Sequence, residues 1–358
     1  MKILLLINLL IIATSECSVN AECVIRNNEP ICECKSQNCL EKIYDLLKKQ
    51  SDLKELNLMR KNIEELPEGI FDNLRSLEKL DLLFNHLKKI SPTTFKNTEI
   101  LKTLDITGNK LESLESGTFT TLTHLENLRL MYNKIQTLDS DVFHTLENLK
   151  QLLLGYNQLT TIDDETFKNL FAVEEIGLEH NKIREISKDL FKNNKNLINL
   201  YLDTNKISSI DADAFKGLHK LKKLRLHDNE LASLDSNTFS STKNLEVLAL
   251  NVNKLTNIPQ GIFDNLELLE KIYLYKNELT TLPTDLFDNN SKLVIINLGW
   301  NKFTKLSSRL FQNKPSLGYV GLSNSGCIDV SYGNWMDPKV LSAVEKVELS
   351  INIERKCQ

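Results

Sequence analysis

Carboxylate and imidazole side chains recur at intervals of 24 residues in the middle of this 358-residue chain. Two adjacent series share this step: Glu179, Asp203, His227 and His180, Thr204, Asp228. If each interval supplies one strand of a parallel sheet, neighbours within a series lie about 5 Å apart. Acids beside imidazoles can bind a cation or respond to pH. The simpler interpretation, which we favour, is a solvated polar face.

The histidines as a group do not follow a catalytic pattern. They occupy scattered positions within the 24-residue interval: His86, His124, His144, His180, His219 and His227. The sequence contains no GxSxG, HExxH or phosphate-binding glycine loop. We therefore predict that the protein is not an enzyme, and we expect no cofactor and no metal site.

The interval of 24 belongs to a strict internal repeat. Phenylalanine keeps this step without interruption at eleven positions: Phe71, Phe95, Phe119, Phe143, Phe167, Phe191, Phe215, Phe239, Phe263, Phe287 and Phe311. Asparagine keeps it at ten positions, from Asn85 and Asn109 to Asn277 and Asn301. The frame LxxLxLxxNxL fits at twelve starting points, from residue 53 to residue 317. A fixed period with Leu and Asn in register is typical of a solenoid, in which each coil buries its apolar face against its neighbours.

Each part of the repeat has a predicted structural role. The central LxL alternation predicts a short strand with one buried face. The asparagine follows at the turn, where its amide can pair backbone groups of one coil with the next. The phenylalanine rings are expected to stack at the strand spacing of about 4.8 Å, as an aromatic spine under the convex side.

Aromatic side chains are frequent at the strand positions that the core does not need. Numbered from the first leucine of a coil, these are positions 2, 3, 5, 7 and 8, and they hold six of the eight tyrosines. Exposed aromatic patches mark interaction sites. A first cluster, in coils two to five, comprises Leu83, Phe84, Met131, Tyr132, Leu153 and Tyr156. A second cluster, in coils ten and eleven, comprises Tyr273, Tyr275 and Trp300, and Tyr201 lies between the two. The alternative, that the sheet merely tolerates aromatics which shield one another, stays open for both clusters.

The full pattern, LxxLxLxxNxLxxLpxxxFxxLxx, resembles the "typical" class of extracellular leucine-rich repeats over residues 53 to about 327. That class includes Toll-like receptor ectodomains, insect leucine-rich immune proteins and lamprey variable lymphocyte receptors. The resemblance implies an α/β leucine-rich-repeat solenoid shaped like a horseshoe. It further implies a parallel sheet on the concave face, a mostly irregular or 3-10 convex side, and disulfide-bonded end caps.

The first residues have the character of a secretory signal. Lys2 precedes an apolar run over residues 3–12, and small residues follow at Ala13, Thr14 and Ser15. No later run is long and apolar enough to span a membrane, and the last residues are polar. We expect a signal peptide over residues 1–15, with cleavage as late as residue 17, and a soluble extracellular protein. A membrane-spanning Toll-like signalling receptor is disfavoured.

All seven cysteines lie outside the repeats, where disulfide-bonded caps can cover the ends of the solenoid. We assign residues 16–52 to an N-terminal cap, 53–326 to twelve coils with the last truncated, and 327–358 to a C-terminal cap. Likeness to the N-terminal cysteine caps of extracellular leucine-rich repeats pairs Cys23 with Cys34 and Cys32 with Cys39, although the sequence alone allows other pairings.

The C-terminal cap departs from the usual four-cysteine pattern. Only Cys327 and Cys357 are present, and we expect them to pair. Asp337 and Pro338 predict the N-cap and first turn of a short helix over residues 339–346. This departure argues against a variable lymphocyte receptor and a standard Toll-like ectodomain.

These features favour a secreted, non-enzymatic binding protein of innate immunity, similar to the coil-less kind of insect leucine-rich immune protein. Its concave face would recognise an extracellular protein or a microbial surface ligand. A matrix, adhesion or carrier-subunit role is the alternative. The absence of a basic block predicts no nucleic-acid partner. A sequon at Asn289 predicts N-glycosylation on the convex or lateral side of coil ten.

Cys17 is the unpaired member of the seven, and its fate depends on the cleavage site. Cleavage after Ser15 leaves Cys17 free for an intermolecular disulfide with a partner, whereas cleavage after Cys17 removes it. The intact mass of the secreted protein, measured with and without reduction, distinguishes these outcomes. A mature chain with six cysteines would contradict a covalent dimer through Cys17.

Overall fold

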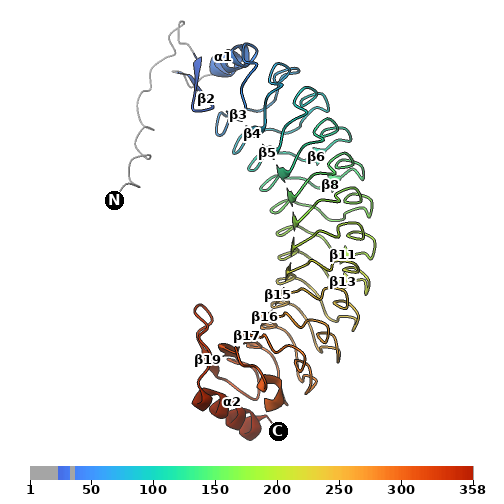
Figure 1. The fold of residues 1–358 in the computed structure, drawn as a ribbon, viewed down its shortest axis with the longest axis vertical. Helices are drawn as coiled ribbons and strands as arrows, with labels where there is room; N and C mark the ends of the chain where they lie inside the picture. The colour runs from blue at the N-terminus through green and yellow to red at the C-terminus, as the bar shows by residue number, and fades with distance from the viewer. Residues whose placement is uncertain (1–22, 33–36, 358) are drawn as a thin grey trace, which may run out of the picture.

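Each coil of the chain contributes one three-residue strand to a single curved sheet. The computed structural model describes residues 23–32 and 37–357. Its coils form an arc with the sheet on the inner side (Figure 1). The strands are β3 (Glu55–Asn57), β4 (Lys79–Asp81), β5 (Thr103–Asp105), β7 (Asn127–Arg129), β9 (Gln151–Leu153), β10 (Glu175–Gly177), β12 (Asn199–Tyr201), β14 (Lys223–Arg225), β15 (Val247–Ala249), β16 (Lys271–Tyr273), β17 (Ile295–Asn297) and β18 (Tyr319–Gly321).

These strands run parallel, and their register equals the sequence repeat. Leu104 of β5, for example, pairs with Leu80 of β4 on one side and with Leu128 of β7 on the other. The central leucine, isoleucine or valine of each strand is buried, while its neighbours, such as Asn127 and Arg129, are half-exposed on the concave face. The predicted solenoid with a concave parallel sheet is therefore confirmed.

The asparagine ladder is also confirmed. Asn157 donates through Nδ2 to the carbonyl oxygens of Leu130, in the preceding coil, and Leu154, in its own coil, both at 3.0 Å. Its Oδ1 accepts from the backbone N–H of Ile135 in the preceding coil, also at 3.0 Å. The same set of bonds recurs along the solenoid. Each buried asparagine thus connects two coils.

The phenylalanine spine is present, but its spacing differs from the expected value. Neighbouring rings stack along two runs, Phe71 to Phe191 and Phe215 to Phe287, with centroids 5.9–6.4 Å apart. The strand spacing of about 4.8 Å holds only on the inner side of the arc. Because the coils fan out toward the convex side, the rings lie farther apart than the strands.

The convex side is built mainly of turns, as expected. Two small parallel sheets lie beyond the strand layer, β6 (Ser113–Leu114) with β8 (Thr137–Leu138), and β11 (Glu185–Ile186) with β13 (Ser209–Ile210). Coil eleven forms a short 3-10 helix, η1 (Ser308–Phe311). Asn289 of the sequon is exposed on this part of the coil, so its glycosylation stays a prediction.

The N-terminal cap consists of a β-hairpin and a helix. Strands β1 (Cys23–Arg26) and β2 (Glu29–Cys32) pair antiparallel, with Cys23 opposite Cys32. Helix α1 (Gln37–Leu47) follows and buries Ile43 and Leu47 against the first coil. Cys17, Cys34 and the proposed signal peptide lie outside the described residues. The two N-terminal disulfides and the domain boundaries remain predictions.

The C-terminal cap contains strand β19 (Ser331–Gly333), antiparallel to β18, and helix α2 (Ala343–Lys356). A helix is present in the cap, as expected, but its predicted range of residues 339–346 was wrong. Ser342, not Asp337, is the N-cap, because its hydroxyl accepts from the backbone N–H of Glu345 while the Glu345 carboxylate accepts from that of Ser342. This reciprocal capping box outweighs the preference of proline for a first turn.

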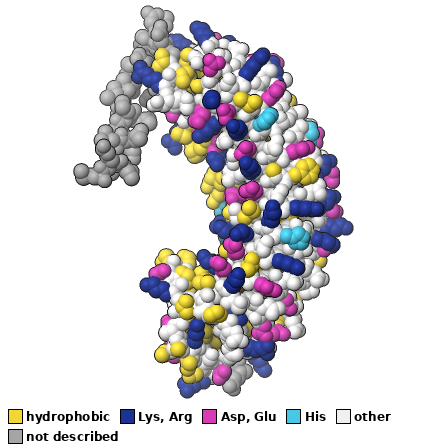
Figure 2. Space-filling model, in the orientation of Figure 1, with side chains coloured by type: hydrophobic (Ala, Val, Ile, Leu, Met, Phe, Trp, Pro, Cys, Tyr) yellow, Lys and Arg dark blue, Asp and Glu magenta, His cyan; other side chains and the backbone are white. Residues whose placement is uncertain are grey.

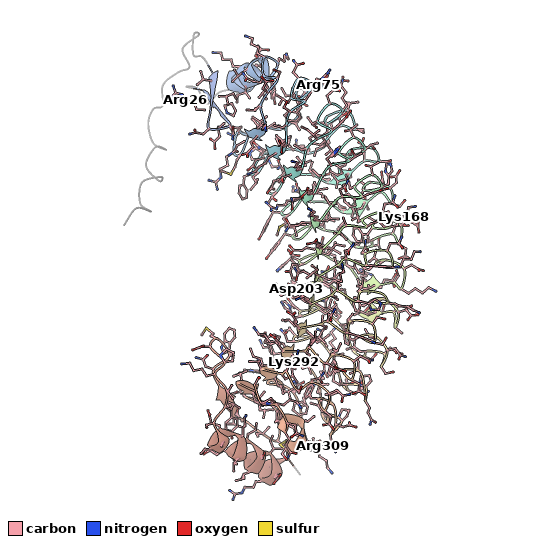
Figure 3. The ribbon with its side chains drawn as sticks, viewed as in Figure 1. Arg26, Arg75, Lys168, Asp203, Lys292 and Arg309 are labelled. Atoms are coloured by element: carbon pink, nitrogen blue, oxygen red, sulfur yellow. A yellow bond between two sulfur atoms is a disulfide. The ribbon has the colours of Figure 1, made fainter. Side chains whose placement is uncertain are left out.

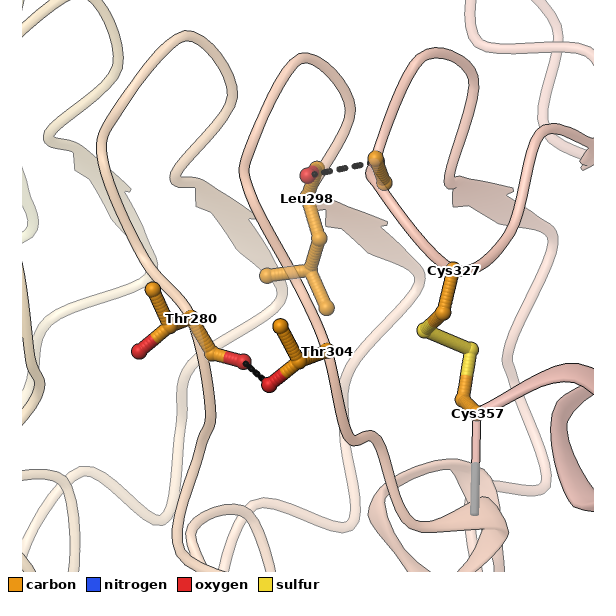
Figure 4. The surroundings of a disulfide bond; sticks show 6 residues. Thr280, Leu298, Thr304, Cys327 and Cys357 are labelled. Atoms are coloured by element: carbon orange, nitrogen blue, oxygen red, sulfur yellow. Dashed lines mark hydrogen bonds between the residues drawn. A yellow bond between two sulfur atoms is a disulfide. The ribbon is translucent and has the colours of Figure 1, made fainter.

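A disulfide joins the end of α2 to the last coil. Cys327 and Cys357 are bonded, with their Cα atoms 5.2 Å apart (Figure 4). Leu349 and Ile353 of α2 are buried against the solenoid. The bond and the two side chains together cover the end of the core.

Replacing Asn157 by Ala tests the ladder. The carbonyls of Leu130 and Leu154 keep a second donor, from Asn133 and Asn181. The Ile135 N–H loses its Asn157 acceptor, and the two carbonyl bonds to Asn157 are lost as well, so we expect the free energy of unfolding to fall by about 3 kcal/mol. Urea titration measures it.

The matched control is Asn148→Ala, which removes an exposed amide with one bond to the Thr123 carbonyl. We expect a loss of about 1 kcal/mol or less for this control. Similar losses for the two variants would contradict the ladder as the source of stability.

Candidate binding surface

The concave face is formed by positions 3, 5 and 7 of each coil and is bordered by position 8. Figure 3 shows Asp203, a position-7 residue, on the inner side of the arc and Lys168 on the outer side. Because positions 4 and 6 supply the buried leucines, the residues at 3, 5, 7 and 8 are free to vary in chemistry. A ligand on the inner side meets these side chains.

Position 8 has a left-handed backbone in all twelve coils. Its φ values are near +55° for residues as different as Tyr132, Asp228 and Trp300. Left-handed geometry costs about 1–2 kcal/mol for a residue with a Cβ. The asparagine at position 9 holds the turn in place, and the position-8 N–H donates to the next coil, as from Tyr156 to the Glu179 carbonyl at 2.9 Å. Apart from Gly108, His180, Asp228 and Asn324, the residues at position 8 are of types that seldom adopt this conformation.

Position 8 aligns four rings into an exposed group that we call the aromatic column: Phe84, Tyr132, Tyr156 and His180. The ring centroids of Tyr132 and Tyr156 are 4.1 Å apart, and those of Tyr156 and His180 are 4.0 Å apart. Phe84 lies over Gly108, where an added Cβ would come within 2.4 Å of the ring. Gly108 therefore makes room for the Phe84 ring between coils two and four.

The column remains accessible to solvent. Phe84 is 44% exposed and Tyr132 is 49% exposed, and Arg60 covers the end of the column with its guanidinium 5.2 Å from the Phe84 centroid. The repeat pattern predicted the first three rings as concave residues, whereas His180 was assigned to the polar series and Arg60 was not singled out. His180 and Arg60 can be recognised from the sequence because both occupy position 8 of their coils.

The remaining predicted residues divide between two surroundings. Met131 and Leu153 are half-buried on the sheet beside the column, and Tyr201 lies under the Arg225 guanidinium at 4.9 Å. Tyr273 and Tyr275 line a groove of about 700 Å³ with Tyr319 and the cap residue Trp335. Trp300 is instead a position-8 residue, 56% exposed, with the Lys276 amine 5.8 Å from its ring. The second predicted cluster is thus divided between the groove, which contains Tyr273 and Tyr275, and position 8, which holds Trp300. The prediction did not include Trp335.

The polar series forms a partly buried acid–imidazole row on the concave face. His227 Nε2 lies 3.5 Å from Asp203 Oδ2. The Glu179 side chain fills space left by two glycines, since a Cβ on Gly155 would come within 2.2 Å of its carboxylate and one on Gly177 within 3.0 Å. Burial, followed by the charge of Asp203, raises the pKa of Glu179, and burial lowers the pKa of His227. The row is therefore less solvated than expected for a polar face, since Asp203 is buried and Glu179 and His227 are half-buried.

Neither a metal centre nor a membrane span is found in the part of the chain that the structure describes. No group of three His, Cys, Asp or Glu side chains among residues 23–32 and 37–357 is arranged to hold a metal ion. No helix within those ranges is long and apolar enough to cross a membrane.

Replacing Glu179 by Gln tests the cost of burying this carboxylate. A raised folded-state pKa means that stability is lost as pH rises from the unfolded pKa through the folded one. We therefore expect Glu179→Gln to be more stable than the wild type at pH 7. The gain should disappear below about pH 4, where the carboxyl is protonated in both states.

Urea titrations at both pH values measure this difference. The exposed Glu147→Gln is the control, and we expect it to change stability little at either pH. A wild type as stable as Glu179→Gln at pH 7 would contradict the analysis.

Two repeat models match the sequence. A leucine-rich repeat model matches residues 51–111, 75–135 and 123–183. A model described as a BspA type leucine-rich repeat region matches six copies over residues 184–318. No curated protein matches the chain.

Solved leucine-rich-repeat structures are similar to most of the chain. The receptor in a TLR13–ssRNA13 complex is 28% identical, with a TM-score of 0.70, over 80% of this chain and 45% of the receptor. A chain of the Drosophila Toll–Spätzle complex is 23% identical, with a TM-score of 0.65, over 78% of this chain and 40% of its own length. A leucine-rich-repeat protein of Leptospira interrogans is 24% identical, with a TM-score of 0.65, over 89% of this chain and 85% of its own.

The chain thus spans less than half the length of the Toll-type structures that it matches. Toll and the Leptospira protein are less than 25% identical to this chain, so their likeness shows only that the fold is shared. The repeat models together with the parallel sheet, the ladder and the spine show that the chain is a leucine-rich-repeat protein that resembles the ectodomains of Toll-like receptors.

Proposed function

We propose that the protein is secreted and binds an extracellular protein or a microbial surface ligand through its concave face, without catalysing a reaction. The aromatic column is the observation that carries this proposal. Exposed rings aligned along the border of a concave surface are unusual on a protein that has no partner. Tyrosine is also among the residues that contribute most to binding energy at interfaces.

The geometry of the column supports recognition by a preformed surface. Tyr132 and Tyr156 support each other by stacking, and their backbones are held by the asparagine ladder. Side chains that are ordered before binding lose little conformational entropy when a partner arrives. Figure 2 shows hydrophobic side chains along the inner edge of the arc, interspersed with charged ones.

An innate-immune role is part of this proposal, and the structural relatives support it at the level of fold. One of them is described as a complex in Drosophila development and innate immunity. Another is described as a complex with ssRNA13, and this likeness does not support our exclusion of nucleic acid. We favour a protein or microbial ligand over a nucleic acid because few cations lie beside the exposed rings of the column.

The double variant Tyr132→Glu/Tyr156→Glu tests the column. Two carboxylates in place of the stacked rings should prevent apolar burial, so we expect capture of the partner from extracellular fluid to fall about tenfold or more, while secretion is unchanged. Quantitative affinity capture with the intact secreted protein measures it.

The matched control is Phe171→Glu, which replaces an exposed ring outside the concave positions by a carboxylate. This variant should capture the same partner as the wild type. If the double variant retains full capture, the column is not the binding site.

A further inference from the structure

A groove at the C-terminal end of the concave face differs in chemistry from the aromatic column. Its floor is made by strands β14 to β18, and Trp335, in the loop after β19, forms a wall. The groove has a volume of about 700 Å³, within the range of small-ligand sites. We propose that this groove binds a short acidic oligosaccharide.

The charged residues of the groove point to an anionic ligand. Its lining contains the cations Lys223, Arg225 and Lys271 and, among the described residues, no carboxylate. Lys223 and Lys271 lie at the same position of β14 and β16, with β15 between them, so their Cα atoms are about 10 Å apart. Arg225 is two residues along β14, and the Tyr201 ring positions its guanidinium. Such spacing suits a ligand with more than one negative group.

The uncharged residues suit a sugar better than a flexible peptide. Tyr273, Tyr275 and Tyr319 present rings to the groove, and the flat apolar face of a pyranose can stack on such rings. Asn297 offers an amide that can bond to hydroxyls. Gly321 leaves the space for it, because a Cβ there would come within 2.5 Å of Asn297 Oδ1 and 2.8 Å of the Tyr319 hydroxyl.

The wall of the groove is fixed by a close backbone contact. Gly333, at the end of β19, has φ +77°, and a Cβ there would come within 2.0 Å of the Gly318 carbonyl. The antiparallel pairing of β19 with β18 therefore turns the following loop over the sheet. Trp335 is 57% exposed at this loop. Figure 2 shows hydrophobic side chains on the part of the C-terminal cap that faces the hollow of the arc.

The neighbouring coils limit the length of the ligand. Glu175, Glu179 and Asp203 lie on the adjacent coils six and seven. A long polyanion that continued along the sheet from Lys223 would meet these carboxylates. The charge boundary therefore favours a short acidic saccharide, or the acidic end of a glycan, over a nucleic-acid strand.

Calorimetric titration of the intact secreted protein tests this site with defined probes. Digalacturonate carries carboxylates and a sulfated chondroitin disaccharide carries a sulfate, so the two distinguish the sources of the negative charge. Lactose serves as the neutral comparison. We expect one site that binds at least one acidic probe and does not bind lactose.

Substitutions locate the binding. We expect Lys223→Gln/Lys271→Gln to weaken the affinity about tenfold or more, through loss of two charge-assisted contacts. The control Lys168→Gln/Lys192→Gln removes the same charge from the convex side, where each lysine pairs with an acid three residues earlier, and should leave affinity unchanged. Trp335→Ala alters only an exposed side chain and should weaken binding about fivefold or more.

The inference rests on the proposed use of the concave face, but its failure can be distinguished from failure of the proposed function. Tyr132→Glu/Tyr156→Glu should keep full saccharide affinity, since the column lies several coils from the groove. The proposal would be overturned if neither acidic probe binds, or if a uridine decanucleotide or a hexaglutamate peptide binds in place of the saccharides. Equal losses of affinity in the two lysine double variants would also overturn it.

Discussion

The buried asparagine at position 9 is the constraint on which the rest of the structure depends. The turn of each coil leaves a backbone N–H and a backbone carbonyl to be paired by the asparagine of the next coil. The asparagine Oδ1 accepts from that N–H, and its Nδ2 donates to that carbonyl. No coil is complete without its neighbour. The parallel sheet, the left-handed residue at position 8 and the regular stacking of side chains all follow from this exchange, because it fixes one coil against the next in the same orientation each time.

The single period of 24 residues gives different spacings on the two sides of the solenoid. Tyr132, Tyr156 and His180 stack at 4.0–4.1 Å on the inner side. The phenylalanines of the spine stack at 5.9–6.4 Å nearer the outside. Strand hydrogen bonds set the inner distance, whereas bulky rings hold the outer part open. The curvature of the arc therefore allows the rings of the column to stack more closely than the rings of the spine.

Features that follow the period could be predicted from the sequence. The strands, the ladder, the spine and the concave location of Tyr132, Tyr156 and Tyr273 depend only on a residue's place within its coil. The ring spacing could not, since curvature arises from the packing of all coils together. The burial within the polar row was underestimated for a related reason: Glu179 is half-buried because Gly155 and Gly177 leave space for its side chain. Helix α2 and the Trp335 loop lie after the repeat, where contacts with the last coil decide the structure and no register indicates them.

The ladder ends at a residue that cannot continue it. Ser325 occupies the asparagine position of coil twelve, is fully buried, and donates its hydroxyl to the Leu298 carbonyl. Its hydroxyl has a single proton to share between the Leu298 and Ser323 carbonyls, whereas the asparagine amide has two and a separate acceptor oxygen that reaches the coil before. The caps are thus matched to the ends of the array and not to its length. In evolutionary terms, the gene can gain or lose whole in-frame coils between residues 53 and 325 while both ends stay intact, so the length of the recognition surface can change independently of the residues that close it.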